Sequence, residues 1–212
     1  MTTPLDILVM ETRGHYADVT VAQLEGAGHR VHRCFTPEDK GFPCRGVTSP
    51  DDCPIDQGVD VALVVRPRVV PQATTLEAGV TCALRAGVPV VEDGQATLDP
   101  FATWITRRAD DAGVVAACED AVADGWASLR DRIVRRALHL MAGTSGTGQL
   151  GCDFERQGHR LKVRLSGPPL PDDRVHALAV RTVDAVRSEG HRTQEIDVSY
   201  TPTTPEEHGH EH

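Results

Sequence analysis

The chain has 212 residues, of which 40% are hydrophobic and 4% aromatic, so it is long enough to bury one large core or two small ones. A formal net charge of −9 argues against general attraction to nucleic acid or to an anionic membrane surface. The longest apolar runs, such as residues 61–65, are far shorter than the roughly 20 residues that cross a bilayer. Residues 1–10 also lack the pattern of a targeting segment. We therefore expect a cytoplasmic protein whose six cysteines are reduced.

The first half of the chain alternates between strand and helix patterns. The successive patterns cover residues 5–10, 17–26, 29–35, 59–65, 76–87 and 88–91. The near-continuous apolar run 59–65 is typical of a strand buried on both faces. Because β-α-β units connect parallel strands, we predict an α/β ligand-binding domain over residues 1–106 with an open, mostly parallel, Rossmann- or flavodoxin-like sheet.

A long polar connection, residues 36–58, interrupts this alternation. It is punctuated by Pro and Gly and is unusually long for a compact domain, which indicates either a functional loop or disorder.

The second half of the chain predicts a small separate unit. Residues 107–142 form a helical segment that could divide at Gly125, and the glycine-rich residues 143–153 resemble a linker. Residues 154–201 predict a small α+β domain of βαβ type, in which Asp172 caps the helix and Gly190 ends it. Such a unit is too small to be stable alone, so we expect it to dock on the first domain or to form a homodimer. The His-rich tail 202–212 is expected to be disordered.

Ligands of open parallel sheets bind beyond the carboxyl ends of the strands, near the point where the strand order reverses. The segments 11–15, 66–68 and 92–94 follow three of the expected strands. Their arginines suit a phosphate or carboxylate, although pairing with neighbouring acids or simple solvation would also explain them. The predicted ligand-binding residues are Thr12, Arg13, His15, Arg66, Arg68 and Asp93.

Glu77 admits two interpretations. The run Thr74-Thr75-Leu76-Glu77 fits a capping box, in which the glutamate reaches back to the backbone amide at the start of the helix. Alternatively, Glu77 lies at the edge of the expected pocket and serves as a catalytic nucleophile or general base, which requires a partner to position it.

The segment 59–91 resembles the core of nucleoside 2-deoxyribosyltransferase-like proteins. The resemblance is carried by Asp60 on a strand, by Thr75-Leu76-Glu77-Ala78-Gly79-Val80, and by Gly87-Val88-Pro89 leading into the next strand. Pro71-Gln72-Ala73-Thr74-Thr75 replaces the Asp-Ser-Gly-Thr type of run that usually precedes the glutamate. The resemblance implies that Glu77 is the nucleophile, that the ligands are nucleosides or nucleotides, and that the chemistry takes place at an N-glycosidic bond.

Three cysteines in and beside the long connection form a second candidate site. Cys34, Cys44 and Cys53 are spaced C-x9-C-x8-C, and Cys82 could join them in space. Thiolates suit zinc or an iron–sulfur cluster, whereas redox-active thiols and unreactive cysteines are the alternatives.

Three classes of function therefore stay open. The first is binding of an anionic, nucleotide-like small molecule at the sheet edge, with or without glycosidic chemistry. The second is a cysteine-ligated metal or iron–sulfur protein, and the third is a non-catalytic regulatory or assembly protein. The sequence does not decide whether the protein is an enzyme.

Overall fold

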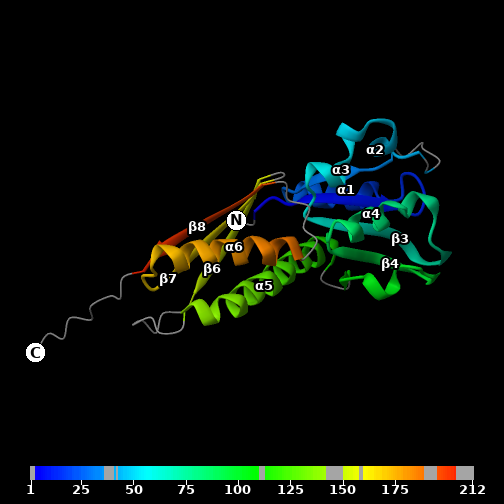
Figure 1. The fold of residues 1–212 in the computed structure, drawn as a ribbon. Helices are drawn as coiled ribbons and strands as arrows, with labels where there is room; N and C mark the ends of the chain where they lie inside the picture. Colours follow the sequence, from blue (N-terminus) through cyan, green and yellow to red (C-terminus); the bar gives the residue numbers. More distant parts are fainter. Residues whose placement is uncertain are drawn as a thin grey trace, which may run out of the picture. The chain divides into compact units, whose positions relative to one another are not determined.

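The computed structural model describes residues 3–35, 41, 43–109, 113–141, 150–157, 160–188 and 195–203. The chain divides into one unit of Met1–Gly125 with Gly190–Arg192 and a second of Trp126–Glu189 with Thr193–His212. Each unit has its own sheet (Figure 1). The first sheet is parallel and the second is mixed, which confirms the predicted α/β class with a small C-terminal α+β unit.

Five parallel strands in the order β2-β1-β3-β4-β5 form the first sheet. Val, Ile and Leu dominate the buried part of its central strands, since both faces of a parallel sheet are covered. The strands are β1 (Asp6–Glu11), β2 (Arg30–Arg33), β3 (Val61–Gln72), β4 (Val90–Leu98) and β5 (Arg107–Arg108).

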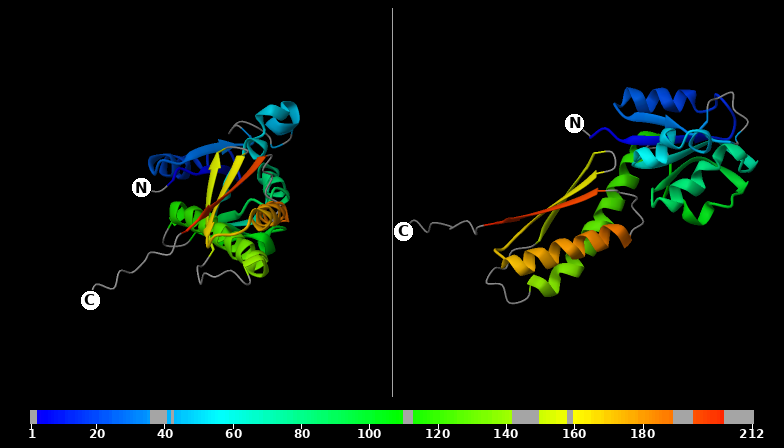
Figure 2. Two further views of the ribbon diagram at one scale, coloured as in Figure 1. Left: turned by 60° about the vertical axis from the view of Figure 1, so that its left-hand side comes forward. Right: turned by 45° about the horizontal axis from the view of Figure 1, so that its top comes forward.

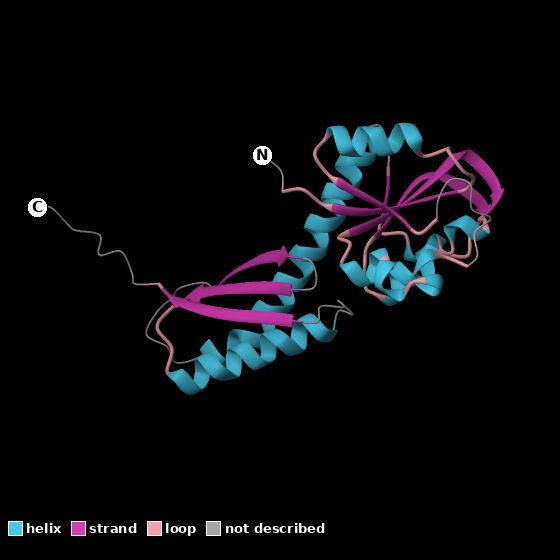
Figure 3. Ribbon diagram, turned by 90° about the horizontal axis from the view of Figure 1, so that it is seen from above, coloured by secondary structure: helices cyan, strands magenta, loops and turns pink. Residues whose placement is uncertain are grey.

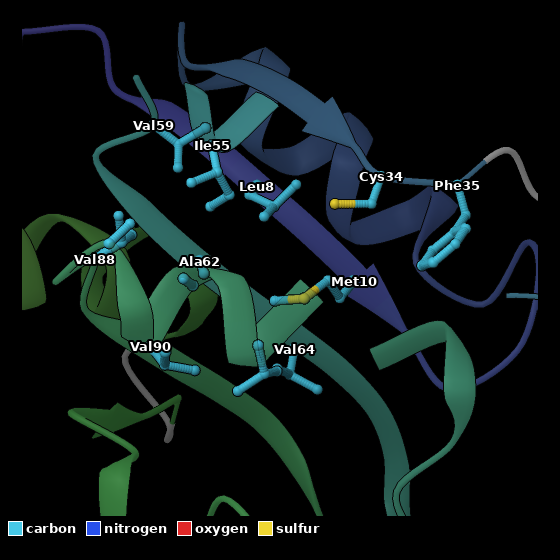
Figure 4. Close-up of a cluster of buried hydrophobic side chains, with 13 residues drawn as sticks. Leu8, Met10, Cys34, Phe35, Ile55, Val59, Ala62, Val64, Val88 and Val90 are labelled. Atoms are coloured by element: carbon cyan, nitrogen blue, oxygen red, sulfur yellow. The ribbon is translucent and has the colours of Figure 1, made fainter. Parts of the chain in front are cut away.

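Helices cover both faces of this sheet. Figure 3 shows α1 (Asp18–Gly26) on one face and the helices that include α4 (Gly79–Arg85) on the other. The α4 face carries a core that includes Leu8, Met10 and Val64 (Figure 4). The other elements of the unit are α2 (Arg45–Thr48), α3 (Pro54–Gln57), the 3₁₀ turns η1 (Pro50–Asp52), η2 (Thr75–Glu77) and η3 (Ala102–Trp104), and the start of α5 (Gly113–Met141).

Strands β3 and β4 extend well beyond their neighbours. Their register shifts between Val65 and Val69, and the two strands then stay paired as far as Gln72 and Leu98. Gly94 makes this irregularity feasible, because its φ is +79° and an added Cβ would lie 2.5 Å from the Arg66 carbonyl oxygen and 2.6 Å from that of Pro67. The close backbone approach fixes the position of Arg66 at the end of the continuous buried stretch of β3.

The second unit is a three-stranded sheet with helices on one face. Strand β6 (Gly151–Gln157) pairs antiparallel with β7 (Arg160–Gly167), which pairs parallel with β8 (Glu195–Pro202). Helix α6 (Asp172–Ser188) connects β7 to β8, and α6 lies beside α5 in Figure 2. The core of this unit combines apolar residues of α5, α6 and the strands, including Leu129, Leu161 and Leu178.

Several predicted boundaries are wrong. Residues 43–57 contain short helical turns rather than an extended loop, and β6 begins at Gly151, inside the segment predicted as a linker. Helix α5 is continuous through Gly125, because one glycine costs only about 1 kcal/mol in a helix and does not break it. Gly190 and residues 204–212 lie outside the described residues.

Candidate functional site

The end of β1 lies beside Val65 of β3 and, across β3, level with Asp93 of β4, whereas β3 and β4 themselves continue to Gln72 and Leu98. Glu11 is in register with Val65, and Val65 is in register with Asp93. The Thr12 amide also donates to the Val65 carbonyl, at 3.2 Å. Segment 11–15 begins at the end of β1, but segments 66–68 and 92–94, which were predicted to follow strands, lie within β3 and β4. All three segments nevertheless lie toward the same edge of the sheet.

A buried arginine with three acidic partners lies at this edge. The Arg66 side chain is fully buried, and its Nε and Nη2 donate to Glu77 Oε2 at 3.0 and 2.7 Å. Its Nη1 donates to Glu92 and also to Asp99 Oδ2, at 2.8 Å. Of the three interpretations of this arginine, namely ligand binding, pairing with neighbouring acids and solvation, pairing with acids describes the structure. Arg66 is consequently committed to holding β3, η2, β4 and the segment after β4 together.

Glu77 belongs to this network and does not reach the surface. Its exposed fraction is 0%, and the Thr12 hydroxyl donates to its Oε1 at 2.9 Å. The capping box is wrong, because no side chain caps η2 and the Thr74 hydroxyl instead donates to the Thr12 carbonyl, at 2.9 Å. In this arrangement a substrate cannot contact the Glu77 carboxylate, so the geometry lends no support to a nucleophilic role.

The other two acids link the network to neighbouring segments. Glu92 Oε2 accepts from Arg108 Nε, at 2.7 Å, and Asp99 Oδ1 accepts from the Phe101 amide, at 2.8 Å. Burial acts to raise the pKa of Asp99, but hydrogen bonds from Arg66 and from the Phe101 amide outweigh it and hold this pKa below its ordinary value. Asp99 is therefore ionised at neutral pH.

An open cleft of about 490 Å³ lies next to this network. Of the predicted ligand-binding residues, Arg66, Arg68 and Asp93 line it. The complete lining is Tyr16, Arg66, Arg68, Asp93, Gly94, Gln95, Arg108 and Ala109. Sequence reasoning missed Arg108, because the two-residue strand β5 that positions it gives no periodic signal.

The other predicted ligand residues lie outside this lining. Thr12 is occupied with Glu77, and the Arg13 guanidinium lies over the Tyr16 ring, 5.4 Å from its centroid. His15 has a φ of 67°, and its Nδ1 lies 3.1 Å from Asp18 Oδ2. The loop after β1 therefore contributes Tyr16 directly to the cleft and Arg13 only through the Tyr16 ring.

The charges in the cleft are not equivalent. The Arg66 guanidinium is paired with three buried acids, and Arg108 is paired with one of them, Glu92. Arg68, in contrast, is exposed and has no acidic partner among the described residues. Burial raises the pKa of Asp93 above its ordinary value. Arg68 is thus the cation in the cleft that is available to a ligand, and Asp93 is the neighbouring group that most easily loses its negative charge.

The predicted metal ligands Cys34, Cys44 and Cys53 all lie in the first unit. Cys44 and Cys53 pack against the core that contains Cys34. Burial, together with the nearby thiols of Cys44, Cys53 and Cys82, raises the pKa of Cys34 to about 12. Among the described residues, no three His, Cys, Asp or Glu side chains are placed to hold a metal ion. The described geometry therefore does not support a zinc or iron–sulfur site.

A second cleft of about 500 Å³ lies beside the edge strand β2. It holds none of the predicted ligand-binding residues, and Arg33 and Arg45 are its arginines. Arg33 is paired with Glu11 and Asp18, whereas Arg45 is exposed and provides a useful comparison for Arg68.

In comparisons with known proteins, no family model matches the chain, and a search of curated proteins found no match. Over the described part of the chain, no helix is both long enough and apolar enough to span a membrane.

Proposed function

We propose that the first unit binds a small anionic ligand, bearing a phosphate or carboxylate group, in the cleft beside Arg66. The observation that carries this proposal is Arg68, an exposed guanidinium at the carboxyl edge of a parallel sheet that has no acidic partner among the residues the structure describes. This edge is where ligands of open α/β sheets bind. A guanidinium fits a phosphate or carboxylate through two parallel hydrogen bonds.

The buried network has a different role from the cleft surface. Arg66 donates four hydrogen bonds to Glu77, Glu92 and Asp99, so few of its N–H groups remain to bind a ligand. Its contribution is to hold β3 and β4 at the bulge, so that Arg68 and Asp93 face the same cleft. Preorganised groups bind ligands more tightly because less ordering is required on binding.

The resemblance to nucleoside 2-deoxyribosyltransferase-like proteins favours a nucleotide-like ligand, and Tyr16 offers an aromatic surface beside the arginines. Cleavage of an N-glycosidic bond through Glu77 would require its carboxylate to leave Arg66 and Thr12 and to enter the cleft. We therefore propose ligand binding as the activity and assign no bond cleavage to this arrangement.

The test is ligand binding to the full chain, measured by thermal shift and calorimetry with inorganic phosphate, sugar phosphates and nucleoside monophosphates. Uncharged nucleosides serve as negative controls. Arg68→Ala should weaken binding of the anions by roughly 10- to 100-fold, which corresponds to one charge-assisted hydrogen-bonded contact. Arg45→Ala removes another exposed arginine, at the other cleft, and should change the affinity by less than about 2-fold. Equal losses in the two variants, or no binding of any anion at millimolar concentration, would refute the proposal.

A further inference from the structure

Strand β8 is the open edge of the second sheet. The strand order is β6-β7-β8, so within the described residues β8 has a neighbouring strand on one side only. The Thr203 amide donates to the Gly167 carbonyl of β7, at 2.7 Å. Backbone groups alternate in direction along a strand, so the odd-numbered residues of β8 point toward β7. The N–H and C=O groups of Ile196, Val198 and Tyr200 consequently point to the open edge.

The side chains of the same three residues form an incompletely covered apolar strip. Ile196, Val198 and Tyr200 pack against the core of the second unit yet remain half-buried, while the intervening side chains are exposed. Natural edge strands commonly use Pro, Lys or other charged residues to prevent pairing with another chain. In β8 the proline is confined to the last position, Pro202, and the charged residues are Glu195 and Asp197, so the stretch from Val198 to Thr201 carries none of these features. Unpaired backbone groups therefore lie beside apolar surface that a further strand would cover.

The opposite edge of the sheet is better protected. Arg130 Nε donates to the Cys152 carbonyl of β6, at 2.8 Å, and its guanidinium lies over the Phe154 ring, 6.0 Å from the centroid. A cation placed over an edge strand hinders the approach of another chain. Self-association through this sheet is thus directed to β8.

We propose that β8 pairs antiparallel with β8 of a second copy, about a two-fold axis that passes beside Val198. In this register Val198 faces the partner's Val198, and Ile196 faces the partner's Tyr200. All the outward-pointing N–H and C=O groups of these three residues then find partners, and aromatic and β-branched side chains lie opposite each other, a stabilising cross-strand pair. The two sheets join into one continuous sheet.

The positions of Asp197 and Pro202 favour this register over the two registers whose axis is shifted by one residue. An axis at Asp197 places two aspartates opposite each other, and an axis at Ser199 places Pro202, which has no N–H, opposite the partner's Ile196. With the axis at Val198, Asp197 faces the partner's Ser199 and no like charges meet. The strand is therefore complementary to itself in one alignment.

The test is sedimentation velocity of the full chain over a range from low to high micromolar concentration, where the unaltered chain should shift from monomer to dimer. Ser199→Asp places an aspartate opposite the partner's Asp197 at two symmetric positions, and should raise the dimer dissociation constant by roughly 3- to 30-fold. Ser199→Lys replaces this repulsion with attraction and should lower the constant. Ser128→Asp makes the same charge change at an exposed position on α5 and should leave it unaltered.

The double variant Asp197→Lys with Ser199→Asp restores opposite charges across the axis, and should recover the dimer that Ser199→Asp weakens. Hydrogen exchange at the β7 amides confirms that each variant keeps its fold. A chain that stays monomeric throughout the concentration range would overturn the proposal. So would shifts of the same sign for Ser199→Asp and Ser199→Lys, or a Ser199→Asp effect no larger than that of Ser128→Asp.

Discussion

Replacing Arg66 with methionine should destabilise the first unit strongly and in a pH-dependent way. Arg66→Met keeps much of the apolar stem but removes the cation that Glu77 and Asp99 share; Glu92 retains Arg108. A buried carboxylate that loses its cation either stays charged at a high cost or takes up a proton. For a carboxyl group of ordinary pKa, near 4.3, taking up one proton at pH 7.5 costs about 4 kcal/mol. This cost is the upper limit for one carboxyl group, so we expect a loss of about 3–5 kcal/mol at pH 7.5, the range found when one partner of a buried ion pair is removed.

The sign of the pH dependence follows from the same reasoning. The cost of protonating a carboxyl group falls by about 1.4 kcal/mol for each pH unit, so the loss should shrink by about 2.7 kcal/mol between pH 7.5 and 5.5. In the unaltered chain Arg66 holds the pKa of Asp99 below its ordinary value, against the effect of burial. The stability that this pair contributes is present above the ordinary pKa, near 3.9, and is lost only as the pH falls through the lower folded value. Both measurements lie above that window.

Hydrogen exchange resolved by peptide separates the two units. Amides of β3 and β4 report the opening free energy of the first unit, and β7 amides report that of the second. The matched control is Arg107→Met, which removes a partly exposed arginine that also has two acidic partners, the exposed Asp120 and Asp124, and should cost no more than about 1 kcal/mol.

Replacing Glu77 and Asp99 by uncharged residues should restore stability to the Arg66→Met variant. Arg66→Met combined with Glu77→Gln and Asp99→Asn leaves no uncompensated charge at these positions, so much of the lost stability should return. Two results would refute the reasoning: a loss for Arg66→Met below about 1 kcal/mol, or an equal loss at pH 7.5 and pH 5.5.

Three further predictions concern other parts of the first unit. Gly94→Ala should lower the free energy of unfolding, measured by thermal unfolding, by at least about 2 kcal/mol more than Gly113→Ala does. Both glycines have a positive φ (79° and 85°), but only at Gly94 would the new methyl group meet backbone oxygen atoms. Equal losses of stability in the two variants would contradict the structure. Iodoacetamide at pH 8 should alkylate the exposed Cys82 well before Cys34, because Cys34 is buried and its pKa is raised to about 12. Mass spectrometry follows the order of alkylation, and the reverse order would contradict the prediction. Binding of sulfate, measured by calorimetry, should strengthen as the pH is lowered toward the pKa of Asp93, which burial holds above its ordinary value, because the carboxylate then loses its charge. Asp93→Asn should remove this part of the pH dependence, and an unchanged dependence in that variant would contradict the prediction.

The parallel sheet was predictable because its signals are local. A run of β-branched residues such as Val61-Ala62-Leu63-Val64-Val65 specifies a buried strand without reference to the rest of the chain. The crossover rule then places the ends of the strands at one edge. Three of the six predicted ligand-binding residues, Arg66, Arg68 and Asp93, line one cleft for this reason.

The partners of these residues were not predictable, because they depend on long-range geometry. Asp99 lies 33 positions from Arg66, and no local pattern joins the two. Thr74 and Glu77 have the right spacing for a cap, yet the buried guanidinium competes for the carboxylate more strongly than a backbone amide does. Likewise, β3 and β4 continue beyond their apolar cores because the bulge at Gly94 lets their polar ends stay paired.

The buried arginine network also constrains how this sequence can change over evolution. Loss of Arg66 alone leaves Glu77 and Asp99 buried without their cation. Loss of Glu77 or Asp99 alone leaves the buried Arg66 guanidinium with fewer acidic partners. A wholly apolar set of side chains at these positions could be as stable as the charged set, but single steps between the two pass through an unfavourable intermediate. Positions 66, 77 and 99 are therefore expected to vary together among relatives, so a relative with an apolar residue at position 66 should lack both acids.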